Sequence, residues 1–410
     1  MSSLYDRFQD YTMTERDGRL PVLDGARALF VFVVAAYHIW QQSWLTPVIR
    51  IGSWSQSLDP LLRSGYMWVD AMLLLSGFLL YLPYAEAAEG GKPAPKVLPF
   101  YKKRLLRIVP SYYLCVLVML LFAALPRGSY QNGDGTLNLW NMGRDVLAHL
   151  TFTHTLFGFS YTATPLNAAL WTLGVEMQFY LIFPWVGRLF KKWPMLTYLL
   201  LVGAAFGYRA WVRTLPDTTL YFNQLPAQLD VYANGMLGAA IYSALKRRMK
   251  QDRWTRALFT ALLAVAVCVI WGLVKDQASS NGYENIRLGQ MDHRYPMSGL
   301  CALFLLGLLY GARPIRLLFG NRVTAVLSAI SFQFYMWHQV FAVQLKMWHI
   351  PASVTETPWT TGERSWQILF TVMSFAGALA ISALVTYAFE QPIARWGRRK
   401  LTGSAAKKYK

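Results

Sequence analysis

Charged side chains are scarce in this sequence, and their scarcity limits what the protein can be. Asp, Glu, Lys and Arg make up 15% of the 410 residues, whereas hydrophobic residues make up 55%. Soluble globular domains carry about 25% charged residues. The composition therefore excludes an ordinary soluble protein and favours a chain that places much of its surface in hydrocarbon.

Cysteine is also rare, with Cys115, Cys268 and Cys301 as the three residues of this type. All three lie within apolar segments, and they show neither the spacing of metal ligands nor the pattern of a disulfide framework. We interpret them as small buried hydrophobic residues. No metal site and no tightly bound cofactor are expected.

Ten apolar runs come close to the length that crosses a bilayer core, which is about 20 residues of helix. They are residues 23–44, 65–84, 106–126, 168–187, 194–210, 229–245, 255–273, 295–311, 323–345 and 366–390. The sequence therefore predicts an all-α, polytopic integral membrane protein with about 10 transmembrane helices. We expect a multi-pass protein of the plasma membrane.

The 40 Lys and Arg outnumber the 21 Asp and Glu, and their distribution predicts an orientation. With the N-terminus inside, 28 of them fall in inner segments and 11 in outer segments. Cytoplasmic loops carry an excess of Lys and Arg, so both termini are predicted to be cytoplasmic. The net charge of +19 then reflects topology and contact with the lipid bilayer, and no nucleic-acid partner is expected.

One membrane domain, residues 21–395, is expected between a cytoplasmic tail at 1–20 and a basic cytoplasmic tail at 396–410. No cleavable signal peptide is predicted, because the first apolar run is long and follows a polar tail. The outer connections are longer than the inner ones, and long loops on one side of a scaffold often carry function. We therefore expect a ligand to bind at the outer face.

Four titratable residues from four predicted spans fall at a similar depth: His38, Asp70, Glu176 and His338. At about 1.5 Å of rise per residue, they lie roughly 8–12 Å from the outer ends of their helices. Charged groups within a bilayer are costly and commonly mark a site or a pathway. The alternative is that these residues only join helices through hydrogen bonds.

A second polar group is predicted at the inner face, where Arg27, Arg104, Arg107 and Glu390 lie near the ends of their spans. Arg104 and Arg107 are three residues apart and share a helix face. Arg27 and His38 are eleven residues apart, which is about three turns and roughly 16 Å along one face. The stretch between them therefore links the two layers. The alternative for Arg104, Arg107 and Lys103 is that they only snorkel toward the headgroups, whereas Arg27 faces the same way as His38.

Most of these residues lie in six segments. The segments are LDGARALFVFVVAAYH, WVDAMLLLSGFLL, RLLR followed by IVP, WTLGVEMQFYLIFP, FYMWHQVF and FEQP. In this order they resemble the motifs of the membrane-bound acyltransferase 3 family, from residue 20 to residue 395. The resemblance implies an O-acyltransferase that uses cytoplasmic acyl-CoA, with acetyl-CoA expected, and acylates a hydroxyl of an extracytoplasmic glycan or another small hydroxylated acceptor.

The resemblance also assigns roles. His38 matches the catalytic histidine of the family's Arg-x10-His signature and Arg27 matches its arginine, while Arg104 and Arg107 match its RxxR pair. Glu176 matches the first acid of a WSLSVEEQFYL-like pattern.

The chain departs from that pattern at two positions, because Gly174 stands where Ser is common and Met177 replaces the second acid. It also shows no fused extracellular hydrolase-like domain of the kind found in some relatives. The acceptor step would then take place in the membrane domain or use a separate extracytoplasmic acceptor protein.

The implied mechanism uses both layers. The three arginines would bind the phosphates of CoA, and neutral His38 would take the proton of the attacking hydroxyl. Asp70 or Glu176 would orient His38, and a transient acyl-imidazole remains an alternative. Further supporting residues are expected to be Tyr37, Ser76, Trp171, His338 and Glu390.

Two rival interpretations remain. A transporter or flippase of an acylated or glycosylated metabolite would also place ionisable groups in the membrane, but transporters usually show internal repeats, which we do not find. An inactive scaffold is the other rival, and the intact signature argues against it.

Overall fold

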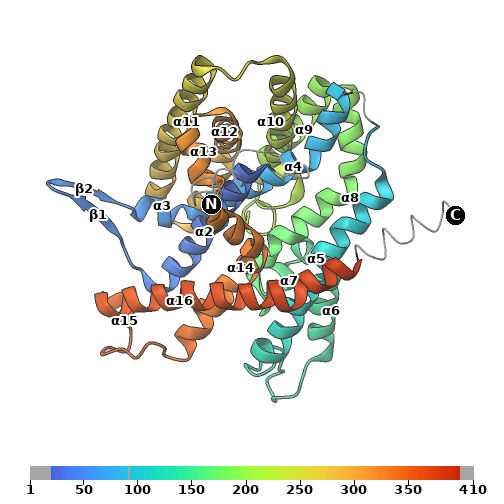
Figure 1. The fold of residues 1–410 in the computed structure, drawn as a ribbon. Helices are drawn as coiled ribbons and strands as arrows, with labels where there is room; N and C mark the ends of the chain where they lie inside the picture. Colours follow the sequence, from blue (N-terminus) through green and yellow to red (C-terminus); the bar gives the residue numbers. More distant parts are fainter. Residues whose placement is uncertain (1–19, 91–92, 398–410) are drawn as a thin grey trace.

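The computed structural model describes residues 20–90 and 93–397, and this part of the chain is almost entirely helical (Figure 1). The long helices are α2 (Pro21–Ser43), α4 (Trp68–Gly90), α5 (Val97–Met119), α8 (Trp171–Lys192), α9 (Pro194–Val212), α10 (Leu229–Arg248), α11 (Arg253–Ser279), α12 (Tyr283–Tyr310), α14 (Arg322–Met347) and α16 (Arg364–Val385). Each overlaps one predicted span, so the all-α expectation is confirmed. The predicted tails lie almost wholly outside the described residues.

Shorter elements connect the long helices. They are α3 (Asp59–Arg63), η1 (Gly65–Met67), η2 (Leu120–Ala124), α6 (Leu139–Leu150), η3 (His154–Leu156), α7 (Gly158–Tyr161), η4 (Ala168–Leu170), η5 (Leu225–Gln228), α13 (Arg313–Phe319), α15 (Pro358–Thr361) and η6 (Thr386–Glu390). Strands β1 (Val48–Ile51) and β2 (Trp54–Ser57) form an antiparallel hairpin that projects from the helical body (Figure 1). The sequence did not predict this hairpin.

Six helices within the described residues are long and apolar enough to cross a membrane, and seven if α12 and α13 form one bent span. The protein is therefore multi-pass, while the count of ten and the orientation stay predictions. Helix α10 shows why a count based on apolarity alone gives fewer spans than the ten predicted. Of its 20 residues, 11 are buried in the bundle, and Asp230 and Asn234 are among them, so these polar side chains meet protein rather than lipid.

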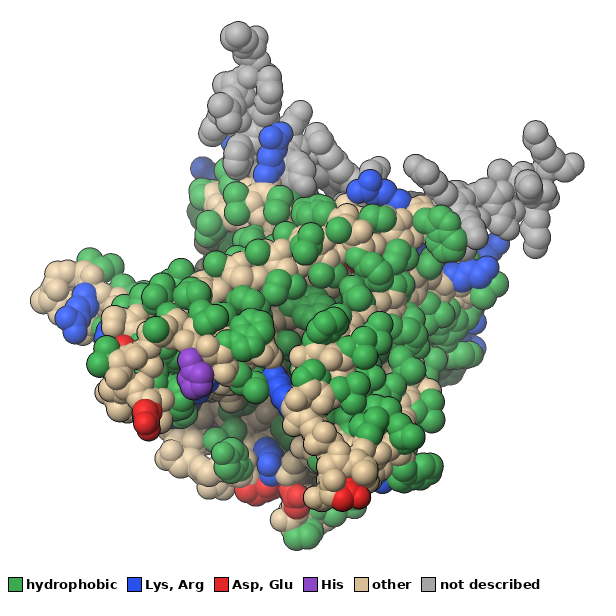
Figure 2. Space-filling view, turned by 90° about the horizontal axis from the view of Figure 1, so that it is seen from below, with side chains coloured by type: hydrophobic (Ala, Val, Ile, Leu, Met, Phe, Trp, Pro, Cys, Tyr) green, Lys and Arg blue, Asp and Glu red, His purple; other side chains and the backbone are tan. Residues whose placement is uncertain are grey.

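Hydrophobic side chains cover most of the face shown in Figure 2, as expected of a surface that contacts lipid tails. Large exposed examples include Phe122 and Leu199, which are 73% and 58% exposed. Asp and Glu side chains gather along one edge of this face, and several Lys and Arg lie along the opposite edge (Figure 2). The surface between these two edges is rich in hydrophobic side chains (Figure 2).

Helices α4 and α10 approach each other closely through small residues. A Cβ atom placed on Gly235 would lie 2.1 Å from the carbonyl oxygen of Leu74, so only glycine fits there. Helix α14 lies against both α2 and α16. These two contacts fix α2, α4 and α14, the helices that carry His38, Asp70 and His338.

The predicted orientation can be tested by labelling single cysteines in a variant that lacks the three native ones. A cysteine within residues 246–256, which hold six Lys and Arg, should react with a membrane-impermeant maleimide only after the membrane is opened. One within residues 127–167, which hold two, should react in intact cells. The reverse pattern would show that the chain is inserted the other way round.

Candidate active site

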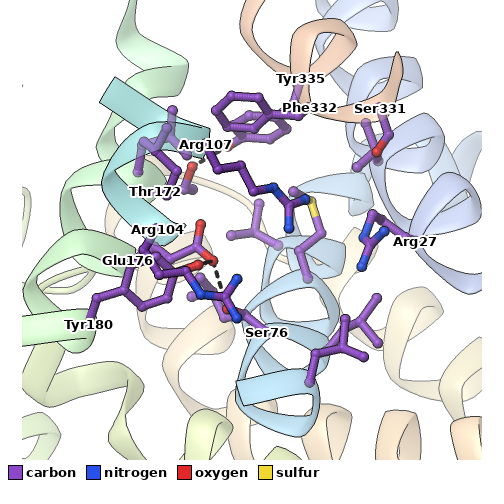
Figure 3. A pocket seen from close by; sticks show the side chains of 18 residues that line it. Arg27, Ser76, Arg104, Arg107, Thr172, Glu176, Tyr180, Ser331, Phe332 and Tyr335 are labelled. Carbon is purple, nitrogen blue, oxygen red and sulfur yellow. Dashed lines mark hydrogen bonds between the residues drawn. The ribbon is translucent and has the colours of Figure 1, made fainter. Parts of the chain in front are cut away.

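A cavity lies between α2, α4, α5, α8 and α14 (Figure 3). The space between its atoms is about 860 Å³, part of it open to solvent. The polar side chains that line it are Arg27, Ser76, Arg104, Arg107, Thr172, Glu176, Tyr180, Ser331 and Tyr335. Apolar residues such as Val31 and Leu73 form the remaining wall.

Arg27 is held at one side of the cavity by two polar neighbours. Its Nη1 donates hydrogen bonds to Oδ1 of Asp24 at 3.3 Å and to Oγ of Ser328 at 3.1 Å. The Ser328 hydroxyl also donates to Oδ1 of Asp24 at 3.0 Å. Sequence reasoning missed both partners, although Asp24 lies three residues before Arg27 on the same helix and could have been found.

Arg104 and Arg107 reach the same cavity from one face of α5, as their spacing predicted. The Arg104 guanidinium lies over the rings of Phe100 and Tyr180, with its central carbon 5.7 and 5.3 Å from the ring centres. Such cation–π contacts hold a guanidinium in place without neutralising it. Figure 3 shows the Arg27, Arg104 and Arg107 side chains pointing into a common space. The structure therefore brings the three predicted arginines together.

Glu176 lies among these arginines rather than beside His38. Its Oε1 accepts hydrogen bonds from the Ser76 hydroxyl at 2.6 Å and from the Tyr180 hydroxyl. The sequence placed Glu176 and His38 in one layer by counting residues from the helix ends. Such a count gives a common depth only for parallel helices that begin at one level, and transmembrane helices are commonly tilted. Ser76, a predicted supporting residue, thus meets Glu176.

His38 pairs with His338, which lies 300 residues further along the chain. The Nδ1 atom of His38 is 2.8 Å from Nε2 of His338, and Nδ1 of His338 is 2.9 Å from the Phe334 carbonyl oxygen. A carbonyl only accepts, so Nδ1 of His338 must carry its proton. In the neutral rings, Nε2 of His338 then accepts from Nδ1 of His38. This arrangement leaves Nε2 of His38 with a free lone pair.

Two tyrosines surround the histidine pair. The Tyr335 ring centre is 5.8 Å from that of His338, and Tyr335 also lines the arginine cavity. The Tyr37 ring centre is 5.0 Å from that of His38, and the Tyr37 hydroxyl accepts a hydrogen bond from Gln41 Nε2 at 2.8 Å. Tyr335 therefore connects the cavity to the histidine pair.

Asp70 has a different setting from the one expected. It lies 3.3 Å from Nε of Arg294, and both side chains are buried. Arg294 also donates to the Phe222 carbonyl and to Asn223 Oδ1, each at 2.9 Å. The catalytic role of Asp70 stays a prediction, and its observed neighbour is an arginine rather than His38.

The remaining predicted residues lie at the edges of the site. Trp171 begins α8 and packs, partly buried, against the core. Glu390 ends η6 and accepts a hydrogen bond from Gln333 Nε2 at 2.7 Å. Gln333 Oε1 in turn accepts one from the Trp337 indole at 3.2 Å.

His154, which sequence reasoning passed over, supports the start of α8. Burial, with a smaller effect of the neighbouring His149, lowers the pKa of His154 to about 3, so its ring is neutral. Its Nε2 donates to the Leu170 carbonyl at 3.2 Å, and Nδ1 accepts from the Tyr112 hydroxyl at 3.3 Å. A Cβ on Gly174 would lie 2.8 Å from this ring. The imidazole thus fills the space that a serine at position 174 would need.

These features define a multi-pass membrane protein whose helices surround a cationic cavity next to a partly buried histidine pair. A family model described as an acyltransferase domain matches residues 20–385. The chain belongs to this family, acyltransferase 3, as its motifs indicated.

Several curated proteins are similar over part of the chain. Peptidoglycan O-acetyltransferase OatA of Listeria monocytogenes is 25% identical over 207 residues, which are 48% of this chain and 29% of that protein. O-acetyltransferase OatA of Staphylococcus aureus is 28% identical over 41% of this chain and 24% of its own length. Nodulation protein 10 of Rhizobium leguminosarum is 29% identical over 35% of this chain and 38% of its own length. No solved structure matches.

Proposed function

We propose that this protein is a membrane O-acyltransferase that moves an acyl group, acetyl in the simplest case, from cytoplasmic acyl-CoA to a hydroxyl of an extracytoplasmic glycan or a similar hydroxylated acceptor. The observation that carries the proposal is the His38–His338 pair, whose hydrogen bonds leave Nε2 of His38 free to take a proton. Membership of the acyltransferase family and the adjacent cationic cavity support it.

The cavity suits the charged end of the donor. Its lining includes three arginines and one glutamate, which gives a net charge of +2. Guanidinium groups bind phosphate oxygens through paired, charge-assisted hydrogen bonds. Apolar residues such as Val31 and Leu73 border the arginines and lower the local polarity, which strengthens these contacts. In this proposal the CoA phosphates bind at the arginines, and the pantetheine arm extends along α2 toward His38.

The transfer step follows from the free lone pair. The acceptor oxygen attacks the thioester carbonyl carbon while Nε2 of His38 takes the hydroxyl proton. The resulting imidazolium is stabilised by the hydrogen bond from Nδ1 of His38 to His338. When the carbon–sulfur bond breaks, the CoA thiolate takes the proton from Nε2, which restores neutral His38. In the alternative, His38 itself attacks the thioester and carries the acyl group as an acyl-imidazole before the acceptor hydroxyl takes it.

The choice of acceptor rests on the relatives. One of them is named a peptidoglycan O-acetyltransferase and another an O-acetyltransferase, although each is matched over less than a third of its length. Both names point to a hydroxyl as the group that is acetylated. Peptidoglycan and other cell-envelope glycans are therefore the first acceptors to test for this chain.

The direct test uses the full chain, purified in lipid nanodiscs, with acetyl-CoA labelled in the acetyl group. We expect CoA to be released only when a muropeptide or oligosaccharide is added. The label should then appear on the glycan as an alkali-sensitive ester. A protein that binds acetyl-CoA but releases no CoA with any envelope glycan would contradict the acyltransferase proposal. Uptake of a labelled glycan into sealed vesicles without any acylation would favour a transporter instead.

A double substitution tests the donor site. Arg104→Gln with Arg107→Gln should raise the Kd for acetyl-CoA by about tenfold or more, because two charge-assisted phosphate contacts are lost. Turnover at saturating acetyl-CoA should fall much less. Binding can be measured by calorimetry on the nanodisc protein.

Lys102→Gln with Lys103→Gln is the matched control, because it removes the same charge from the same helix at side chains that do not line the cavity. Equal weakening by both double variants would show that general surface charge, and not the cavity, attracts the donor.

A further inference from the structure

A second hollow lies on the outside of the helical body, between α11 and α13. It encloses about 1000 Å³, most of it open to the surroundings. Arg253, Arg256 and Arg313 lie at the ends of the two helices, and Ala257, Ala261 and Ala264 form the floor. We call this hollow the α11–α13 groove, and it is separate from the arginine cavity described above.

The alanines of the groove form a straight apolar channel. Ala257, Ala261 and Ala264 follow one another at helical spacing on one face of α11, over roughly 10 Å of its length. All three are exposed, and the small side chains leave room for a hydrocarbon chain beside the helix. The most apolar 18-residue window of α11 has a mean hydropathy of 2.6 and is only 28% buried, as is typical of a helix that contacts lipid.

Within residues 20–90 and 93–397, Arg253, Arg256 and Arg313 form no salt bridge with an acidic side chain, although Asp252 lies near enough to Arg256 for the two charges to attract each other. By contrast, Lys246 and Arg248 nearby have Glu86 and Glu89 within 3.7 and 3.5 Å. The adjacent acid, Asp252, is occupied as the cap of α11, because its side chain accepts a hydrogen bond from the Thr255 backbone at 2.8 Å.

Another arginine adds to this excess of positive charge. Arg316 lies one turn beyond Arg313 on α13, and its Nε is buried without a hydrogen-bond partner in the described part of the chain. The end of the groove therefore holds more positive charge than Asp252 balances, and an anionic group would offset the excess.

We propose that the α11–α13 groove binds an anionic phospholipid of the surrounding bilayer. The lipid phosphate lies among Arg253, Arg256 and Arg313, and one acyl chain lies along the alanines. Basic pockets between membrane helices bind such headgroups through the same contacts. A soluble phosphate would contact the arginines alone. A lipid would also place an acyl chain in the apolar channel, so the channel favours a lipid as the ligand.

The bound lipid would also brace the bend between α12 and α13. Thr260 in the groove accepts a hydrogen bond from the Ala312 backbone at 2.9 Å, where the two helices meet at 110°. Helix α13 packs in turn on α2, with Phe319 so close to Gly25 that a Cβ there would be 2.1 Å from its carbonyl oxygen. Lipid at the groove thus stabilises an element that supports the helix of Arg27 and His38.

Native mass spectrometry of the full chain tests the proposal. After detergent purification and lipid removal, the protein is mixed with phosphatidylglycerol or with phosphatidylcholine of the same acyl chains. Wild type should retain phosphatidylglycerol in preference. Arg253→Gln, Arg256→Gln and Arg313→Gln together should weaken that binding at least about tenfold. The control Arg188→Gln, Lys191→Gln and Lys192→Gln removes three charges from the end of α8 and should keep the preference.

A second variant separates a lipid from free phosphate. Ala261→Phe fills the channel and leaves the arginines in place, so it should also weaken phosphatidylglycerol binding, and sn-glycerol 3-phosphate at millimolar concentration should not displace the lipid. An unchanged preference in the triple arginine variant would overturn the proposal. The proposal would also be overturned if glycerol phosphate bound as well as phosphatidylglycerol and Ala261→Phe had no effect on lipid binding. If the triple variant aggregates, the single variants Arg313→Gln and Ala261→Phe replace it. Each should weaken phosphatidylglycerol binding, and unchanged binding in both would overturn the proposal.

Discussion

Replacing His38 by alanine is expected to lower acyl transfer by about 10²- to 10⁴-fold, the usual contribution of a general base. Binding of acetyl-CoA should remain nearly unchanged, because the substitution removes the proton acceptor and leaves Arg27, Arg104 and Arg107 in place. Transfer is measured as CoA release with acceptor present, and binding by calorimetry on the same nanodisc preparation.

Two further variants make the result specific. Arg27→Ala should weaken acetyl-CoA binding, and Arg27→Lys should restore it only in part, because lysine lacks the paired donors of a guanidinium. His338→Gln keeps an acceptor for Nδ1 of His38 through its amide oxygen and should retain more activity than His338→Ala, which keeps none. If His38→Ala retains more than about a tenth of wild-type transfer, His38 is not the base, since even a modest base contributes about 10².

Local spacing was enough to predict much of this site. Arg27 and His38 lie three turns apart on α2, and Arg104 and Arg107 lie on one face of α5, so helix geometry alone relates the members of each pair. The long helices could also be predicted from local sequence, because an apolar run of sufficient length indicates that one segment contacts lipid. Helix α10 could not be classified by apolarity, because its neighbours are protein.

Contacts between distant segments could not be predicted. The sequence offered Asp70 and Glu176 as partners of His38, and the structure gives His38 a second histidine, 300 residues away. Nothing in the spacing of FYMWHQVF shows which side of α14 faces α2. The depth argument put four residues in one layer, yet the structure places Glu176 in the arginine cavity and Asp70 beside Arg294.

Asp70 and Arg294 belong to a buried group of charges. We expect the loss of one member of this group to destabilise the protein strongly. Arg209 on α9 and Asp230 on α10 form a two-pronged ion pair, with distances of 3.0 and 2.6 Å. The Ala227 carbonyl accepts from both Arg209, at 3.1 Å, and Arg294, at 3.4 Å. All four charged side chains are nearly inaccessible, and they join α4, α9, α10 and α12.

Asp230→Ala is therefore expected to lower the free energy of unfolding by about 3–5 kcal/mol, because it leaves Arg209 buried without its counter-charge. Thermal unfolding in detergent, followed by the loss of monodisperse protein, measures the effect. Asp59→Ala is the control, since its partner Arg63 is 44% exposed and such a surface pair contributes about 0–1 kcal/mol. Similar unfolding temperatures for the two variants would show that the buried pair does not hold the helices together.

Asp70→Asn then separates the two roles open to Asp70. If Asp70 only balances Arg294, the variant should unfold at a lower temperature, while the molecules that stay folded keep nearly wild-type transfer. If Asp70 acts on His38, transfer per folded molecule should fall by a factor comparable to that for His38→Ala, with little change in unfolding. The measured distance of 3.3 Å to Arg294 in a buried setting favours the first outcome, because an unpaired buried arginine is costly wherever the reaction takes place.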